Sequence, residues 1–228
     1  MTRVLLVGVL TAVACFGSAE SGLVRARDAQ DRPSMEKILE AAEARAEKNS
    51  KDADAQYQFA IAASYVAEVA LEMKDKPAAK RAAEEGIKGA EAAVALKPSN
   101  GEYFRLLATL YGQAIQDMFS ALSYGKKSKD AMDKAKELEP KSAEVWVADA
   151  VGNYYMPASF GGGPDPAIVS LKRALGLDPN NAEAWLWLGL AQRKKHQDPE
   201  ARKSFEKSLE LNPNRVWARQ QLAKTPAQ

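Results

Sequence analysis

The stretch Ala182–Arg215, AEAWLWLGLAQRKKHQDPEARKSFEKSLELNPNR, decides the fold of this chain. It contains two helical patterns joined by a short polar turn at residues 196–198. In the first pattern Trp185, Leu188 and Gly189 recur at offsets of three and four, so they lie on one helical face. In the second pattern an alanine, a phenylalanine and a leucine share a face in the same way. We therefore predict two antiparallel helices that pack through these faces.

The second helix of this unit has a clear beginning and a clear end. Asp198 can cap it through its carboxylate, and Pro199 fits the first helical position, where no backbone N–H is needed. Pro213 ends the unit. The order of tryptophan, leucine-glycine, alanine, phenylalanine, small residue and proline is the pattern of a helix-turn-helix repeat of about 34 residues. The stretch thus resembles the tetratricopeptide repeat family, and it departs from it mainly at Gln192, where the family has tyrosine.

Further units of this kind are expected along the chain, because one unit cannot bury its own apolar face. Short motifs that contain a proline recur upstream, at residues 177–180 and at Pro140 and Pro98. They predict four repeats, at residues 53–100, 101–142, 143–181 and 182–215. The residue before each start can satisfy the free N–H groups of a helix start. These four residues are Asp52, Asn100, Ser142 and Asn181.

Both ends of this array need a cover, and the sequence offers one at each end. We expect a capping helix at residues 35–50 and a second one at residues 216–224. Residues 20–34 are polar and aperiodic, which predicts a flexible tether, and the last four residues are expected to be disordered. The fold class is therefore predicted to be all-α, with a right-handed α-solenoid of tetratricopeptide-type helix-turn-helix repeats and helical caps at residues 35–224.

The first two repeats are longer than the standard unit, and their glycines make specific predictions. Gly86 and Gly89 each cost about 1 kcal/mol of helix propensity against alanine, so they predict a close approach between helices. The first helix of the second repeat is expected to continue to about Tyr124, before Gly125 breaks it.

The third repeat contains the most unusual local sequence, Phe160 followed by three glycines and a proline. A phosphate-binding loop would need a Lys-Ser/Thr pair after the glycines and a strand before them, and neither is present. The glycines instead predict a tight crossing between two helices in a loop at residues 156–166. Asp165 is expected to cap the next helix, with Pro166 at its first position.

The N-terminus has the layout of a secretory leader. Arg3 precedes an apolar stretch at residues 4–14, and small residues follow at 17–19. We assign residues 1–19 to a signal peptide, too short to cross a bilayer, and expect export to a bacterial periplasm or envelope. Two processing routes are open: ordinary cleavage after the small residues, and a bacterial lipoprotein box with lipidation at Cys15 and anchoring to a membrane. Since Cys15 is the only cysteine, the mature part has no disulfide.

Little in the sequence points to catalysis. His196 is the only histidine and lies in a predicted turn, no residue cluster has metal-ligand spacing, and no nucleophile elbow is present. The formal net charge of +2 argues against binding of nucleic acid or an anionic membrane through bulk charge. We expect no enzyme activity, no cofactor and no metal, and membrane contact only through a lipid at Cys15.

The family resemblance implies a binding surface, because the first helix of each tetratricopeptide repeat lines a concave groove. The groove positions of the family fall on Tyr57, Ile61, Tyr65, Arg105, Thr109, Gln113, Val147, Val151, Tyr154, Tyr155, Leu186, Leu190 and Arg193. Such aromatic, aliphatic and arginine side chains suit an extended peptide or a partner helix. The alternative is structural: the two adjacent tyrosines pack against the insertion loop, and Val147 and Leu190 belong to the core between repeats.

We therefore expect a non-catalytic scaffold or adaptor that binds a protein or peptide partner of unknown identity. Two other functions stay open. A periplasmic ligand-binding or transporter-accessory repeat protein would have an enclosed pocket lined by Tyr57, Tyr65 and Tyr154. A structural, self-associating envelope protein would pair the exposed apolar face of an end helix with a second copy.

Overall fold

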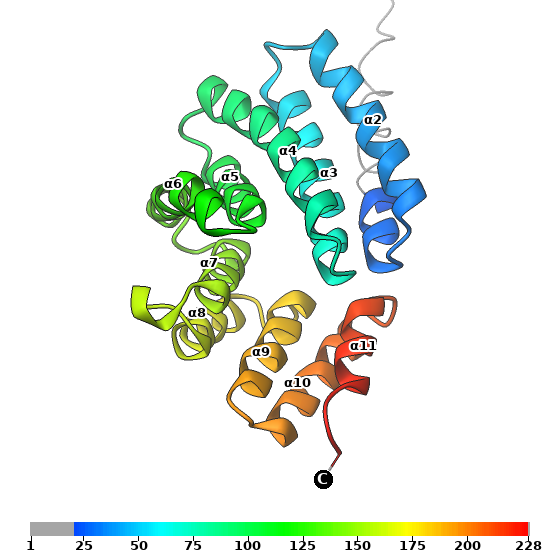
Figure 1. Ribbon diagram of the computed structural model, residues 1–228, viewed down its shortest axis with the longest axis vertical. Coiled ribbons are helices and arrows are strands. Elements are labelled where there is room, and N and C mark those ends of the chain that lie inside the picture. The colour runs from blue at the N-terminus through cyan, green and yellow to red at the C-terminus, as the bar shows by residue number, and fades with distance from the viewer. Residues whose placement is uncertain (1–20, 228) are drawn as a thin grey trace, which may run out of the picture.

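The computed structural model describes residues 21–227, and within them the chain is helical with no β-strand. The helices follow one another as antiparallel pairs that stack into a curved array (Figure 1). The predicted signal peptide and Cys15 lie outside the described residues. None of the helices found between residues 21 and 227 is long and apolar enough to cross a membrane. A helix at residues 21–28 comes first. It is followed by α2 (Arg32–Lys48), α3 (Ala53–Glu72), α4 (Lys76–Leu96), α5 (Gly101–Ala114), α6 (Met118–Leu138), α7 (Ala143–Tyr155), α8 (Pro164–Leu177), α9 (Ala182–Lys194), α10 (Asp198–Leu211) and α11 (Val216–Ala223), with a short 3-10 helix at Ala158–Phe160.

The first helices of the repeats begin at the side chains predicted to cap them. Helices α3, α5, α7 and α9 start one residue after Asp52, Asn100, Ser142 and Asn181. Each of these side chains accepts a hydrogen bond from a backbone N–H in the first turn, at distances from 2.9 to 3.3 Å. The bonds satisfy N–H groups that would otherwise lack a partner, and the four predicted caps are confirmed.

Glycine lets neighbouring helices approach closely, as predicted. A Cβ atom at Gly189 would lie 2.6 Å from the ring of Phe205 in the facing helix α10. A Cβ at Gly86 would lie 2.7 Å from Leu110 Cδ2, and a Cβ at Gly89 would lie 2.7 Å from an aromatic ring of α3. The missing side chains therefore allow α9 to pack on α10, and α4 to pack on both α3 and α5.

The second repeat differs from its prediction. Helix α5 ends at Ala114 and α6 runs through Gly125, so the first helix does not continue to Tyr124. A capping box sets the break: Asp117 Oδ1 accepts a hydrogen bond from the Ser120 N–H, and Ser120 Oγ accepts one from the Asp117 N–H. Such a cap stabilises a new helix start by about 1 kcal/mol. The apolar periodicity does not reveal it.

Two further helix starts lie one or two residues before the predicted positions. Helix α8 begins at Pro164 and α10 begins at Asp198, so neither Asp165 nor Asp198 is a cap. In both helices a proline occupies one of the first two positions, where its missing N–H costs no hydrogen bond. The loop before α8 turns tightly, since a Cβ at Gly162 would lie 2.3 Å from the carbonyl oxygen of Met156, but this contact lies within the loop and not between the two helices.

The two chain ends are more ordered than their sequences indicate. Residues 21–28 form a helix, which corrects the expected tether at residues 20–34. Leu23 and Arg27 of this segment are buried. At the other end Thr225, expected in a disordered tail, is buried as well. The reason is tertiary in both cases, because these residues contact parts of the chain that a local pattern cannot indicate.

The two ends of the array meet. In Figure 1 helix α11 lies next to the place where α3 ends and α4 begins. Asn212 Nδ2 donates a hydrogen bond to Asp28 Oδ2 at 2.8 Å, and Gln220 Nε2 donates one to Gln30 Oε1 at 3.1 Å. The inner side of the array is therefore a hollow between two joined ends, and not an open-ended groove.

Candidate functional site

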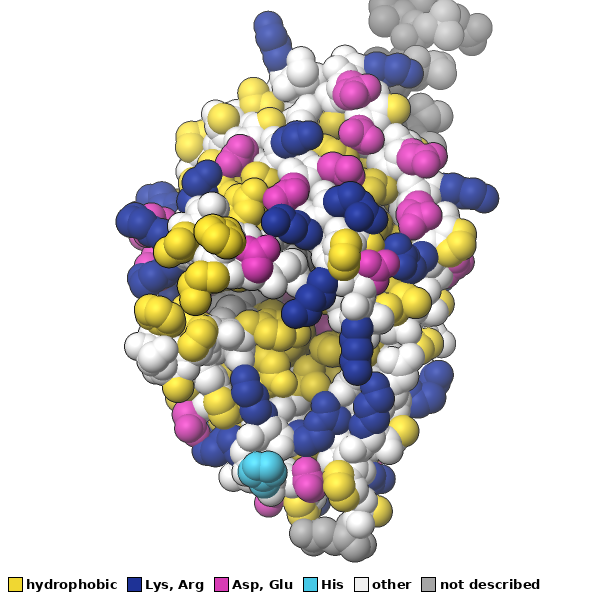
Figure 2. Space-filling view, in the orientation of Figure 1, with side chains coloured by type: hydrophobic (Ala, Val, Ile, Leu, Met, Phe, Trp, Pro, Cys, Tyr) yellow, Lys and Arg dark blue, Asp and Glu magenta, His cyan; other side chains and the backbone are white. Residues whose placement is uncertain are grey.

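The inner side of the array is the candidate site. Figure 2 shows a hollow in the middle of the molecule, with hydrophobic side chains at its floor and lysine and arginine side chains along its border. The predicted groove residues come from the first helices of the four repeats. Consecutive first helices contact one another, α3 with α5, α5 with α7 and α7 with α9, so their residues form a continuous surface.

At the α3–α5 end, two predicted residues meet on the carboxylate of Glu102. The Tyr57 hydroxyl donates a hydrogen bond to Glu102 Oε1 at 2.8 Å, and the Tyr57 ring stacks on Tyr103 with centroids 5.1 Å apart. Arg105 binds the same carboxylate through two hydrogen bonds of 2.5 Å. Burial and the negative charge of Glu102 raise the pKa of Tyr57, so its hydroxyl stays protonated and remains a donor.

Other predicted residues of this half are engaged within the fold. Gln113 Nε2 donates a hydrogen bond of 3.1 Å to a backbone carbonyl of α3, and Thr109 Oγ1 donates one to its own helix. Ile61 is buried in the core, which corrects its assignment to the partner surface. Tyr65 is half-buried, with the guanidinium carbon of Arg27 5.0 Å from its ring centroid.

At the α7–α9 end, aromatic rings form a cluster. Tyr154 meets Trp187 edge to face with centroids 5.6 Å apart, and Tyr155 meets the same indole at 5.9 Å. Trp187 also contacts Trp217 of α11 at 5.4 Å. The Lys194 ammonium lies 4.3 Å from the ring centroid of Tyr154. Because Tyr155 keeps 62% of its surface exposed, it is the ring that a partner can reach most easily.

Sequence reasoning does not identify Trp187 and Trp217 as site residues. Trp187 lies between two family groove positions of α9, and Trp217 belongs to the predicted C-terminal cap helix. The repeat pattern requires a tryptophan at position 185 but not at position 187, so the second tryptophan of α9 is the one available signal. The contact of Trp217 with the cluster depends on how α11 folds back, which no local pattern shows.

Several predicted residues of α7 and α9 belong to the core. Leu186 and Leu190 are buried against α10 and α11, which corrects their assignment to the partner surface. Arg193 is held by α11, because its Nη2 donates a hydrogen bond of 2.6 Å to a glutamine side chain there. Val147 and Val151 are half-buried, and Val147 packs against the core between repeats. The structural alternative thus describes Val147 and Leu190 better than the groove prediction does.

A buried cluster of charged residues joins the two ends of the chain. Arg215 is only 1% exposed, and its guanidinium contacts Glu68 Oε1 at 2.5 Å, Glu183 Oε1 at 2.9 Å and Glu72 Oε2 at 3.2 Å. Glu68 lies 147 residues from Arg215 in sequence, so no local pattern indicates this contact. We call the whole set the charge cluster; it consists of Arg27, Asp28, Glu68, Glu72, Glu183 and Arg215.

The charge cluster has four carboxylates for two guanidinium groups, which leaves excess negative charge when all are ionised. Burial and the neighbouring Glu68 raise the pKa of Glu72 to about 7, although Arg215 acts in the opposite direction. Burial also raises the pKa of Glu68. Burial acts to raise the pKa of Glu183 too, but Arg27 and Arg215 outweigh it and hold this pKa below its ordinary value. Glu72 therefore keeps its proton to a higher pH than an exposed glutamate does.

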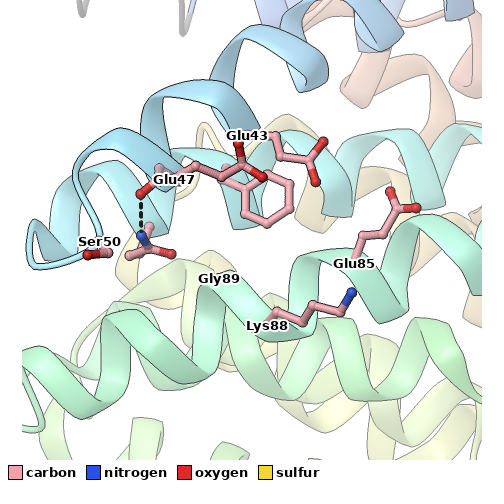
Figure 3. A pocket seen from close by; sticks show the side chains of 9 residues that line it. Glu43, Glu47, Ser50, Glu85, Lys88 and Gly89 are labelled. Atoms are coloured by element: carbon pink, nitrogen blue, oxygen red, sulfur yellow. Dashed lines mark hydrogen bonds between the residues drawn. The ribbon is translucent and has the colours of Figure 1, made fainter.

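A shallow pocket of about 280 Å³ lies elsewhere, between α2 and α4 (Figure 3). Glu43 and Glu47 of α2 face Glu85 and Lys88 of α4 across it. The three tyrosines expected around an enclosed ligand pocket do not line it. In the part of the chain that the structure describes, no group of side chains has the arrangement of a metal site.

Comparison with known families supports the repeat assignment. The profile described as tetratricopeptide repeat matches residues 182–215, and a second profile described as TPR repeat matches residues 165–196. Residues 165–215 of this chain therefore match tetratricopeptide repeats. The matches cover α8, α9 and α10, where the sequence pattern is also clearest.

Similar proteins occur among curated sequences and among solved structures. Human protein O-mannosyl-transferase TMTC1 is 31% identical over 126 residues, which cover 54% of this chain and 13% of the transferase. The thermophilic TPR protein TTC0263 of Thermus thermophilus has a TM-score of 0.62 at 20% identity, over 91% of this chain and 98% of that chain. The human IFIT1 dimer with m7Gppp-AAAA has a TM-score of 0.63 at 19% identity, over 84% and 41% of the two chains. The two structures confirm the all-α solenoid fold.

Proposed function

We propose that this chain is a non-catalytic interaction module that binds a segment of a partner protein in its hollow. The observation that carries this proposal is the aromatic cluster, in which Tyr155 is largely exposed beside Trp187 and Lys194. Rings that neighbours hold in place lose little side-chain entropy when a partner binds. Aromatic residues of this kind dominate the binding energy of protein interfaces.

The chemistry of the hollow favours an extended, narrow segment. Because the two ends of the array meet, the hollow lacks the open length that a long partner helix needs. Tyr155 and Trp187 present ring surfaces to an apolar or aromatic side chain. We therefore infer a peptide that carries an apolar or aromatic side chain.

The other functions have less support from these contacts. Ligand binding in an enclosed pocket is not favoured, because the pocket between α2 and α4 is shallow and lies away from the predicted tyrosines. The transferase activity named for TMTC1 is not carried over, since the match covers 13% of that protein. Action in a bacterial periplasm or envelope stays part of the proposal, and it rests on the leader-like N-terminus and the single cysteine.

Capture of partners by the full chain tests the proposal. With the wild-type chain as bait, mass spectrometry identifies bound proteins, and peptides from them are then titrated by fluorescence anisotropy. Tyr155→Ala is expected to weaken peptide binding by about tenfold or more, because it removes the reachable ring of the cluster. Since this side chain is largely exposed, helicity and melting temperature should not change.

The matched control for this experiment is Leu177→Ala, which removes an exposed side chain at the C-terminal end of α8, away from the aromatic cluster. This variant should bind the peptides like the wild-type chain. Equal peptide affinity of Tyr155→Ala and wild type would contradict the proposal. If no partner is captured and the apparent molecular mass of the chain increases with its own concentration, the self-associating function is favoured instead.

A further inference from the structure

The most exposed large apolar side chains of residues 21–227 gather at one edge of the array. Met118, Phe119 and Leu122 in the first turns of α6 keep 74, 83 and 76% of their surface exposed. Phe160, in the loop before α8, keeps 77% exposed. Figure 2 shows hydrophobic side chains gathered over α6 and this loop, beside the hollow. We call these four residues the apolar edge.

The arrangement of antiparallel pairs explains why these residues lie together. Helices α5 and α7 contact each other and run in the same direction, since α6 returns between them. The turn after α5 and the loop after α7 therefore lie at the same edge of the array. A contiguous exposed apolar patch with polar surroundings marks a site of contact with another molecule.

The apolar edge projects from the surface and does not form a groove. About three quarters of each side chain faces solvent, so the molecule provides no walls between which a folded partner could insert its own side chains. Protruding aromatic and aliphatic side chains can instead insert into an apolar environment that deforms around them. The boundary between the headgroups and the acyl chains of a bilayer is such an environment.

Basic residues flank the apolar edge. Lys80 of α4 lies 3.7 Å from a carboxylate oxygen of Asp117 at the start of α6, which places the first turn of α4 beside the edge. Lys76 lies one turn before Lys80 on the same face of α4, and Lys74 precedes this helix. Among the described residues neither Lys74 nor Lys76 has a carboxylate within ion-pair distance, and Asp75 between them pairs with an arginine of α2. Their positive charges therefore stay available to an external anion.

We propose that the apolar edge is a docking surface for a lipid bilayer with anionic headgroups. Its apolar side chains enter the headgroup boundary, and Lys74 and Lys76 lie among the phosphates. The nearby acidic groups do not oppose this contact, because Asp117 and Asp165 pair with lysines. The net charge of +2 is too small for attraction by the whole molecule, so the contact depends on these local residues.

Co-sedimentation of the full chain with vesicles tests this proposal. Vesicles of phosphatidylcholine with phosphatidylglycerol are expected to bind the wild-type chain more tightly than vesicles of phosphatidylcholine alone. The double variant Phe119→Ser with Leu122→Ser should lose affinity by about tenfold or more, because most of its insertable apolar area is gone. The double variant Lys74→Glu with Lys76→Glu should lose the preference for anionic vesicles.

The matched control is the double variant Leu96→Ser with Leu177→Ser. These leucines are 40 and 42% exposed and end α4 and α8, at the opposite edge of the array. The control should bind vesicles like the wild-type chain, and residues 1–20 contribute equally in all variants. Equal vesicle binding by the Phe119→Ser, Leu122→Ser variant and the wild type would overturn the proposal. A dimer that this variant abolishes, without vesicle binding by the wild type, would overturn it in favour of a second copy.

Discussion

Gly189 is the residue on which the packing of α9 against α10 depends most directly. Any Cβ at this position would lie within 2.6–2.9 Å of three atoms of the Phe205 ring, which is fully buried. Gly189→Leu is therefore expected to destabilise the protein by about 1–3 kcal/mol or more. Urea unfolding followed by circular dichroism measures this change.

The matched control for Gly189 is Gly125→Leu in α6, where nothing lies within 4 Å of an added Cβ. Leucine has a higher helix propensity than glycine, so this variant should gain up to about 1 kcal/mol. If Gly189→Leu and Gly125→Leu changed the free energy of unfolding equally, the contact with Phe205 would not be the reason why position 189 requires glycine.

Single residues also show how far the site could be predicted. The family positions predict Tyr57, Arg105 and Tyr155 on the inner side, because the register of a repeat follows from its own sequence. They are wrong for Leu186 and Leu190, which α10 and α11 cover. The family pattern describes an open groove, whereas in this chain the C-terminal helix folds back onto the array.

At the scale of the element, the helix start at Asp117 accounts for the break between α5 and α6. The Asp117 carboxylate accepts a hydrogen bond from the Ser120 N–H, and removing an N-cap of this kind costs about 1 kcal/mol. Asp117→Ala is therefore expected to destabilise the protein by about that amount in urea unfolding. Asp165→Ala is the control, since this aspartate lies in the first turn of α8 without capping it.

The Asp165→Ala control should change the free energy of unfolding by less than about 0.5 kcal/mol, because its ion pair with Lys195 is exposed. An equal loss in both variants would show that the Asp117 cap adds nothing beyond a surface charge. The outcome also bears on the apolar edge, because the Asp117 cap fixes where Met118 and Phe119 begin α6.

Elements with local signals are the ones that sequence reasoning predicts well. The caps before α3, α5, α7 and α9 lie within a few residues of the N–H groups that they bind, so the sequence shows them directly. The helix at residues 21–28 has no such signal. Its Arg27 and Asp28 are polar, and only their partners in the last repeat, such as Glu183 and Asn212, explain why they are buried.

At the scale of the whole molecule, contact between the chain ends changes how the array holds together. In a solenoid each repeat contacts mainly its neighbours, so end repeats can open alone. In this protein Arg215 contacts Glu68 and Glu72, which lie 147 and 143 residues away in sequence. Opening either end would leave buried charges without their partners, which costs several kcal/mol. The ends should therefore unfold together with the rest of the array.

The charge cluster also makes the stability of the whole molecule depend on pH. In the folded chain burial raises the pKa of Glu72 from 4.5 to about 7, so between these values the folded state binds a proton that the unfolded state has lost. Stability must then rise as the pH falls from about 8 to about 5.5, by about 1–3 kcal/mol. Glu183 works in the opposite direction, but its pKa lies below 4.5, outside this window.

Urea unfolding of wild type and Glu72→Gln across this pH range measures the effect. The amide cannot ionise, so the variant should lose most of the dependence and be at least as stable as wild type near pH 8. Glu85→Gln, which neutralises an exposed carboxylate of α4 outside the charge cluster, should keep the wild-type slope. If Glu72→Gln kept that slope as well, the proton would reside elsewhere in the cluster. If the free energy of unfolding of the wild type instead rose with pH, Arg27 and Arg215 would be sufficient to keep all four carboxylates of the charge cluster ionised in the folded chain.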